Sequence, residues 1–282
     1  MSKRIVIVGG GLFGALAAHL MHSRGQQVLV IDSNERYAGS KAAACLMRPS
    51  WLTKLGNTGK EGLAILDALF GLQTLKFKAG PIHVDVNWVS PSNILNIPGP
   101  VLKGQVINIH PEFLGVLVGE GKGRTLVQIA YDYLLLAAGV WTRQLLDTMP
   151  PIDALTGEAN IYRGQIEQPF IDPWAPYKQI VGFNIDQARV WVGDGSAIKS
   201  ANWTPERTVA VRERCEAKLP PDVVRGFMTT LRGYRPYVTG HPQGYFKQVG
   251  SRTWISTGGA KNGTVLAAAQ AKMFGDAVLG PV

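Results

Sequence analysis

Apolar residues near the N-terminus follow two periods, one typical of buried strands and one typical of a helix. Residues 3–8 and 27–31 are short runs rich in β-branched side chains, and each is predicted to form a buried strand. Between them, residues 12–23 carry apolar side chains at helical spacing, and Gly25 follows as a C-terminal cap. This order predicts a strand–helix–strand unit that ends at Asp32.

The rest of the chain is predicted to alternate between irregular β structure and regular elements. Residues 49–124 carry proline and glycine punctuation with short alternating strands, whereas residues 134–138 form a continuous apolar run typical of a central parallel strand. Thr204 as N-cap and Pro205 at the first position mark the start of a helix that extends to residue 219. Further strands are predicted at residues 179–183, 189–192 and 254–256, and a closing helix at residues 264–279.

These elements predict two domains. A nucleotide-binding domain is assembled from three separated pieces of the chain, and a mostly β domain is inserted between the pieces. The first domain comprises residues 1–50, 125–150 and 235–282. The second comprises residues 51–124 and 151–234.

The composition is that of a folded chain with a sizeable core. Of its 282 residues, 46% are apolar and 17% are charged. Two cysteines, Cys45 and Cys215, are too few for a disulfide framework, and no Cys/His cluster has the spacing of metal ligands, so no metal site is predicted. The longest apolar stretch, residues 126–141, contains Asp132 and falls short of a membrane span. We therefore expect a soluble protein with no membrane partner.

The net charge of +9 is concentrated in the C-terminal third of the chain. Residues 199–261 contain eleven Lys or Arg against four Asp or Glu. Such an excess is typical either of a solvated basic face or of a surface that binds a polyanion such as nucleic acid. On the predicted helix, Arg207, Arg214 and Lys218 have a spacing compatible with one face. The candidate phosphate-binding residues are Arg207, Arg212, Arg214 and Lys218.

A G-x-G-x-x-G motif stands between the first predicted strand and helix. Gly9 allows the tight turn, Gly11 lets the backbone approach a pyrophosphate, and Gly14 lets the helix pack against its strand. The N-terminus of that helix directs N–H groups at the phosphates. Asp32 closes the second strand, where an acidic residue binds ribose hydroxyls. The motif predicts a dinucleotide site without distinguishing FAD from NAD.

Two later segments favour FAD. Residues 134–141 form an apolar strand that ends in small residues, where a second backbone segment approaches the cofactor. Residues 258–264 form another glycine-rich turn before a helix, and a helix N-terminus there faces the electron-rich edge of a flavin and stabilises its reduced, anionic form. We therefore predict that FAD is the cofactor.

Taken in this order, the segments resemble the glycine oxidase and D-amino acid oxidase family of flavoproteins. Further matches lie at residues 40–49, 104–111, 132–141, 163–165 and 233–236. The resemblance implies an α/β (α+β) fold, in which a FAD-binding Rossmann-like domain carries an inserted, mostly antiparallel β substrate domain and the flavin lies between the two. The cofactor-binding residues that the motif and the resemblance predict are Gly9, Gly11, Leu12, Phe13, Gly14, Asp32, Ser40, Lys41, Ala43, Ala44, Val106, Ala138, Gly139, Trp141, Gly259, Lys261, Asn262, Gly263 and Thr264.

The resemblance also implies a catalytic residue. In the family, the arginine of a G-x-R-P motif forms a bidentate pair with the substrate carboxylate, and Arg235 occupies that position here. The family's substrate-orienting tyrosine stays open among Tyr162, Tyr234, Tyr237 and Tyr245. The sequence departs from the family in a compressed stretch at residues 49–104, in Cys45 at a usual glycine position, and in Gly193-Asp194-Gly195.

The implied activity is oxidation of the C–N bond of a glycine-like amine or amino acid, with hydride transfer to flavin N5 and hydrolysis of the imine. The substrate is either free glycine, sarcosine or a D-amino acid, or an amino acid attached to a DNA base, as in phage thymidine hypermodification, with a lyase-like outcome on the base. The basic C-terminal third favours the attached form. An NAD(P)-dependent enzyme and a non-catalytic flavin-fold binding subunit are the alternatives. The expected compartment is the cytoplasm, or the host cytoplasm for a phage-encoded chain.

Overall fold

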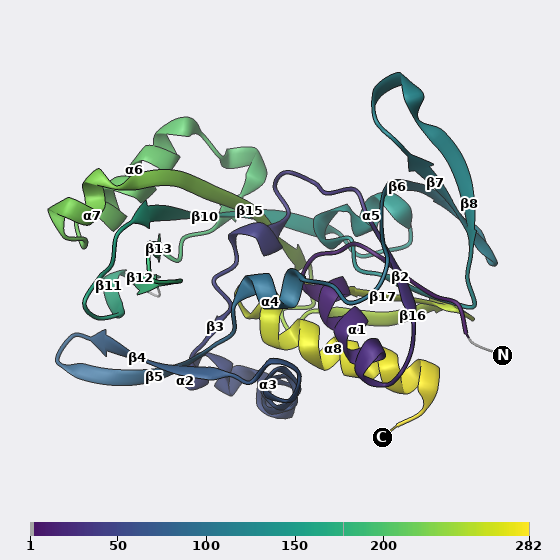
Figure 1. Cartoon of the computed structure of the whole chain (residues 1–282), viewed down its shortest axis with the longest axis horizontal. Helices are drawn as coiled ribbons and strands as arrows, with labels where there is room; N and C mark the ends of the chain where they lie inside the picture. The colour runs from purple at the N-terminus through teal and green to yellow at the C-terminus, as the bar shows by residue number, and fades with distance from the viewer. Residues whose placement is uncertain (1–2, 177, 282) are drawn as a thin grey trace.

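Two β-sheets organise the protein and lie at opposite ends of its long axis (Figure 1). The structure is a computed structural model that describes residues 3–176 and 178–281. Strand β15 and its partner β10 extend from the second sheet towards the first, and this strand pair bridges the two halves of the molecule (Figure 1).

The first sheet has a parallel centre, in which strands β1, β9 and β17 are almost entirely buried. Its order is β16-β17-β9-β1-β2-β6-β7-β8, and the five neighbours from β17 to β6 are parallel. Parallel strands of this kind are continuous apolar runs, as the sequence predicts for β1 and β9. The strands are β1 (Ile5–Val8), β2 (Val28–Asp32), β6 (Val101–Ile109), β7 (Phe113–Val118), β8 (Thr125–Ala130), β9 (Tyr133–Leu136), β16 (Tyr245–Gly250) and β17 (Thr253–Thr257).

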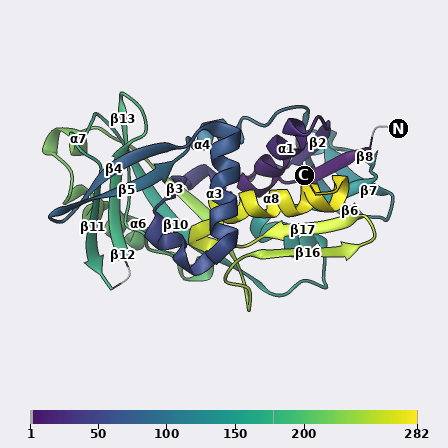
Figure 2. The same cartoon turned by 90° about the horizontal axis from the view of Figure 1, so that it is seen from below.

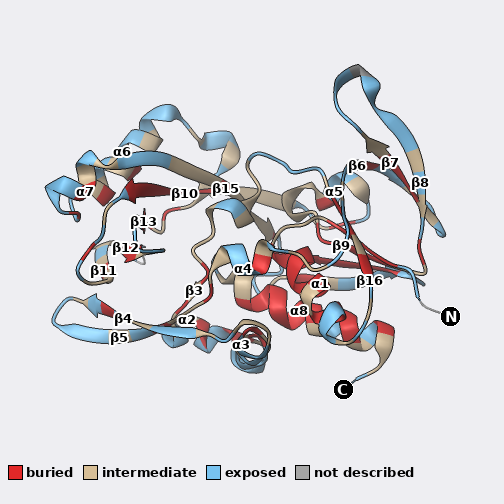
Figure 3. Ribbon diagram, viewed as in Figure 1, coloured by how far each residue is buried: buried red, intermediate tan, exposed pale blue. Residues whose placement is uncertain are grey.

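Helices α1 (Leu12–Ser23) and α8 (Gly263–Leu279) cover one face of this sheet and pack against each other. Both are largely buried (Figure 3). Alternate residues of β1 serve the two faces: Ile5 and Ile7 join the core under the helices, and Val6 and Val8 join the core on the other face. The predicted strand–helix–strand unit is present.

Helix α3 (Gly56–Phe70) is an element that the sequence analysis missed, because it predicted irregular β structure for residues 49–124. Three glycines in the helix argue against it by propensity. Packing explains one of them: a Cβ added at Gly62 would lie 2.2 Å from the backbone oxygen of Val265 in α8. Gly62 lets α3 cross α8 at very close range (Figure 2). The shorter helices include α2 (Pro49–Leu52), α4 (Pro91–Leu95) and α5 (Thr142–Leu145).

The second sheet is mostly antiparallel, as predicted for the inserted domain. Its order is β14-β10-β13-β12-β11-β4-β5-β3, with β15 paired to β10. Helices α6 (Pro205–Glu216) and α7 (Pro221–Arg225) cover one face, and on the other face Val181 and Phe183 of the sheet form a core with residues of its strands β4 and β5. The strands are β3 (Leu46–Met47), β4 (Gln73–Ala79), β5 (Ile82–Trp88), β10 (Ile152–Arg163), β11 (Phe170–Ala175), β12 (Lys178–Asn184), β13 (Arg189–Gly193), β14 (Ile198–Lys199) and β15 (Phe227–Val238).

The sheets differ from the predicted domain boundaries in two places. Strands β6 and β7, assigned to the inserted domain, belong to the first sheet, where Val101 pairs with Val30 of β2. The predicted cut at residue 235 falls inside β15, which pairs with β10 from end to end. Both differences arise because strand pairing joins residues far apart in the chain, and no local pattern records which sheet a strand joins. No helix in the described part of the chain is long and apolar enough to cross a membrane.

Replacing Gly62 by alanine is expected to lower the free energy of unfolding by about 1–3 kcal/mol, despite the higher helix propensity of alanine. The added Cβ meets a backbone oxygen of α8, which has little freedom to move aside. Denaturant unfolding measures the change. Lys60→Ala, at an exposed position of the same helix, is the control and should stay within about 0.5 kcal/mol of wild type. Equal stability of Gly62→Ala and wild type would contradict the close packing.

Candidate active site

A cavity of about 610 Å³ lies between the two sheets. It begins at the carboxyl ends of β1 and β2, where Gly9 and Asp32 line it. It extends to the second sheet, where Gln179 of β12, Trp191 of β13 and Arg235 of β15 line it. Its size and its position at the ends of parallel strands are those of a cofactor and substrate site.

The glycine motif shapes the first end of the cavity. Gly9 has a φ of +105°, and a Cβ added at Gly14 would lie 1.8 Å from the Gly9 oxygen, so α1 starts immediately against β1. Gly14 therefore acts by helix–strand packing and does not line the cavity. At the N-terminus of α1, the Leu12 N–H donates to Ser40 Oγ at 2.8 Å, and a Cβ on Gly11 would meet the same oxygen at 2.7 Å.

Asp32 stands beside this motif. Its Oδ2 accepts a hydrogen bond from the Gly10 N–H at 2.8 Å, and its Oδ1 accepts one from the Asn34 N–H at 2.6 Å. These bonds hold the carboxylate at the carboxyl end of β2, next to the glycine turn before α1. This is the position from which an acidic residue binds the ribose of a dinucleotide.

Most of the residues predicted from the sequence lie together in the cavity wall. Apart from Gly14, the exceptions are Lys41 and Gly259. The Lys41 Nζ donates to the backbone oxygen of Glu35 at 2.8 Å and so holds the turn after β2. Gly259 has a φ of +85° and starts the turn before α8. The predicted residues that line the cavity are Gly9, Gly11, Leu12, Phe13, Asp32, Ser40, Ala43, Ala44, Val106, Ala138, Gly139, Trp141, Arg235, Lys261, Asn262, Gly263 and Thr264.

Arg235 is placed by strand pairing with β10. In the register Leu155 lies opposite Arg235, and the guanidinium reaches diagonally over Gly157, where an added Cβ would lie 2.6 Å from Arg235 Cζ. Among residues 3–176 and 178–281, no acidic side chain forms an ion pair with Arg235. Burial lowers its pKa, and the negative charge of Asp194 partly offsets the effect. Arg235 remains cationic, so it is a partly buried positive charge that lacks a counter-ion.

Lys261 is a second cation in the same cavity. It lies in the 3-10 turn Ala260–Asn262, directly before α8. Burial lowers the pKa of Lys261, and the positive charge of Arg235 lowers it further, which reflects their proximity. Because the N-terminus of α8 adds partial positive charge, this end of the cavity favours anions.

Of the four candidate tyrosines, Tyr234 lines the cavity. Its ring lies between those of Tyr37 and Trp141, at centroid distances of 5.4 and 6.3 Å. The Tyr162 hydroxyl donates to Glu216 of α6 at 3.4 Å, on the far face of the second sheet. Tyr245 is buried in the first sheet. Tyr234 is thus the tyrosine that the fold brings to the site.

The sequence analysis missed several residues that line the cavity, among them Glu158, Gln179 and Trp191. They come from single positions of the second sheet that no motif marks. Glu158 is buried and accepts hydrogen bonds from Arg232 Nε at 2.9 Å and from Thr208 Oγ1 at 2.6 Å. Its charge is therefore already compensated, which leaves Arg235 and Lys261 to define the charge of this end.

Cys45 has a backbone conformation that explains why glycine is usual at its position in the family that the chain resembles. Its φ is +53°, in the left-handed region, and its side chain is buried at the cavity wall. Burial raises the pKa of the thiol to about 12, so the thiol stays protonated at neutral pH. Within the described residues, no group of three or more His, Cys, Asp and Glu side chains is placed to hold a metal ion.

The candidate phosphate-binding residues do not form the open basic face that their spacing suggests. Arg214 pairs with Asp194 at 2.7 Å, and Lys218 pairs with Asp172 at 2.6 Å. Arg212 lies 3.7 Å from Glu216 and over the ring of Phe227. Three of the four charges are therefore compensated by residues of the second sheet or of α6 itself.

Comparisons with known proteins agree with this geometry. Residues 7–44 match the family described as NAD(P)-binding Rossmann-like domain. No sequence among the curated proteins matches the chain. Glycine oxidase from Bacillus cereus ATCC 14579 superimposes with a TM-score of 0.74 at 17% identity, over 99% of this chain and 95% of that one. The chain has the glycine oxidase fold.

Two other solved structures extend the comparison. Iminodiacetate oxidase from Chelativorans sp. BNC1 superimposes with a TM-score of 0.68 at 16% identity, over 99% of this chain and 96% of that one. Glycerol-3-phosphate dehydrogenase from Bacillus halodurans, complexed with FAD, has a TM-score of 0.70 at 14% identity, over 98% of this chain and 64% of that one. The predicted fold class and the resemblance read from the motifs are confirmed at the level of the fold.

Gly11→Val is expected to abolish dinucleotide binding while the protein stays folded. A branched side chain there would occupy the space between the turn and Ser40, into which the pyrophosphate must fit. Titration with FAD, followed by fluorescence quenching, measures binding, and circular dichroism verifies folding. Gly123→Val is the matched control, because no atom lies within 4 Å of a Cβ at Gly123. Wild-type affinity in folded Gly11→Val would show that the cofactor does not approach this turn.

Proposed function

We propose that this protein is a FAD-dependent oxidoreductase that oxidises the C–N bond of a glycine-like amine or amino acid. The observation that carries the proposal is a single cavity with a dinucleotide motif at one end and the uncompensated cation Arg235 at the other. The oxidase names of two structural neighbours and the FAD complex of a third support it.

The residues present fit FAD. Gly9 and Gly11 add no side chains of their own to the cavity wall at the N-terminus of α1, and Asp32 is held beside them for the ribose. Ala43, Ala44 and Gly139 keep the middle of the cavity wall small, as a planar ring system requires. When bound, the flavin would supply the two-electron acceptor that no side chain can provide.

Arg235 binds and orients the substrate in this proposal. Its guanidinium fork pairs with the substrate carboxylate, and Gly157 beneath it leaves the space in which the fork lies flat. Fixing the carboxylate limits where the neighbouring carbon and nitrogen can lie, which is how positioning lowers the barrier. Lys261 and the N-terminus of α8 contribute positive charge that favours an anionic reduced cofactor.

The free amine or amino acid is the substrate form we favour. Glycine and iminodiacetate, named in the two oxidases, both carry a carboxylate on the carbon next to nitrogen. An amino acid attached to a DNA base has the same reacting atoms, but its phosphates need an open basic surface. The ion pairs of Arg214 and Lys218 reduce the surface proposed for that purpose.

Purified protein is expected to be yellow and to release FAD, not FMN or NAD, on denaturation. Under anaerobic conditions, glycine, sarcosine, iminodiacetate or D-alanine should bleach the flavin absorbance. DNA that carries an amino-acid-modified thymidine is the second substrate arm, with binding measured at increasing salt. If only the modified DNA reduces the flavin, and its binding weakens as salt rises, the substrate is an amino acid attached to a DNA base. A colourless protein that does not take up added FAD would end the proposal.

Arg235→Ala should retain FAD but raise the KM for the amine substrate by a factor on the order of a hundred, because a charged, partly buried pair with the carboxylate is lost. Arg235→Lys should recover only part of this, since one ammonium cannot replace the fork. Steady-state kinetics with flavin content as a reference measure both.

Gly157→Ala tests the same placement while keeping the charge. Its Cβ would lie 2.6 Å from the guanidinium carbon, so Arg235 must shift, and we expect KM to rise about tenfold. Wild-type KM in both Arg235→Ala and Gly157→Ala would exclude Arg235 from carboxylate binding.

A further inference from the structure

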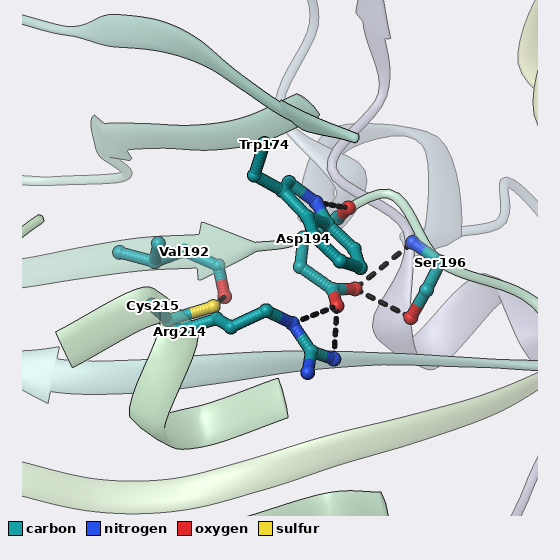
Figure 4. A network of polar contacts seen from close by, with 6 residues as sticks. All are labelled: Trp174, Val192, Asp194, Ser196, Arg214 and Cys215. Carbon is teal, nitrogen blue, oxygen red and sulfur yellow. Dashed lines mark hydrogen bonds and ion pairs between the residues drawn. The ribbon is translucent and has the colours of Figure 1, made fainter. Parts of the chain in front are cut away.

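A buried carboxylate lies directly behind the second-sheet end of the cavity. Asp194 follows β13, and its side chain is 1% exposed. Figure 4 shows how its oxygens are used: Oδ2 accepts from Arg214 Nη2 at 2.7 Å and from Arg214 Nε at 3.2 Å, and Oδ1 accepts from the N–H and the Oγ of Ser196 at 2.9 and 2.6 Å. A carboxylate this deep in the protein persists only when it is paired in this way.

Arg214 is itself held in place by the same network. It comes from α6, and its guanidinium lies over the Trp174 ring at 4.4 Å from the centroid. The Trp174 indole N–H donates to the backbone oxygen of Asp194 at 2.9 Å (Figure 4). Two elements, β11 and α6, therefore contact Asp194, which directly follows β13.

On the cavity side, the neighbours of Asp194 form a wall without side chains. Gly193 and Gly195 both line the cavity. A Cβ on Gly193 would lie 2.7 Å from the Trp191 ring, and one on Gly195 would lie 3.0 Å from the backbone oxygen of Gln179. Gly193 pairs with Val181 of β12, whereas Gly195 lies beyond the end of β13, so the contacts of Asp194 anchor the wall at the point where the strand pairing ends.

We propose that Asp194 and Arg214 are positioning residues, which fix the wall at residues 193–195 and thereby the space in which the substrate is held against Arg235. The inference rests on the proposed function and adds to it residues that do not touch the substrate. It also gives Arg214, predicted from the sequence to bind phosphate, an internal role. The negative charge of Asp194 also offsets part of the lowering that burial causes in the pKa of Lys261, and so favours the cationic form of that side chain.

Glycolate, which has the carboxylate of glycine but no amine, is the probe of choice because it reports binding without turnover. Its dissociation constant is measured on the FAD-loaded protein from the perturbation of the flavin spectrum. Arg214→Gln is expected to weaken glycolate binding about tenfold or more and to raise KM in proportion, with kcat and FAD content nearly unchanged. Arg214→Lys, which keeps a paired charge, should lie between the variant and wild type.

Arg189→Gln is the matched control. It removes another arginine–aspartate pair, Arg189 with Asp186, from the opposite end of the same strand, and both partners are substantially exposed. Glycolate binding and KM should stay at the wild-type values. A rise equal to that of Arg214→Gln would mean that any loss of an ion pair on β13 has this effect, and it would overturn the specific role.

An unpaired buried charge can prevent folding, so a second variant keeps the test decisive. Asp194→Asn combined with Arg214→Gln removes both charges together and leaves amides that can still bond. We expect it to fold and to bind glycolate about tenfold more weakly. Wild-type binding in this double variant would overturn the positioning role alone, whereas wild-type protein that neither binds glycolate nor is reduced by an amine would overturn the proposed function as well.

Discussion

The structure depends on the contact between the end of β1 and the start of α1, where two pieces of backbone meet without side chains between them. A Cβ at Gly14 would lie 1.8 Å from the Gly9 oxygen, and a Cβ at Gly9 would lie 2.4 Å from the Ala137 oxygen after β9. Only glycine permits this proximity. It brings the N-terminus of α1, the end of β9 and the end of β2 to one point, and the cavity starts there.

Close packing against a glycine recurs elsewhere, between α3 and α8 and within the second sheet. Gly62 admits α8 against α3, Gly157 admits the Arg235 guanidinium against β10, and Gly193 admits the Trp191 ring. In each case a missing side chain creates room for one specific neighbour. Because the packing is dense, a methyl group added at any of these glycines has no void to enter and must displace its neighbour. The shape of the cavity is therefore set by backbone and by a few large side chains.

In the second sheet, ion pairing decides which charges remain available at the cavity, and the total number of charged residues does not. Glu158 is matched by Arg232 and Asp194 by Arg214, each with the carboxylate almost fully buried. This leaves Arg235 uncompensated at the cavity, although the region around it carries a large excess of basic residues. Net charge alone was compatible with either a solvated basic face or a polyanion surface, whereas the pairing directs attention to the single cation at the cavity.

The sequence alone determined the elements whose signal is local. The glycine motif with Asp32, the buried strands β1, β2 and β9, and helices α1, α6 and α8 all follow from apolar period, caps and motif spacing, and most of the predicted lining residues meet in the cavity as a result. Only the tertiary structure decided that α3 is a helix, that β6 joins the first sheet, that Gly157 lies under Arg235 and that Arg214 turns inward to Asp194. Each of these depends on a partner far away in the chain, and such pairings leave no periodic trace in the residues around them.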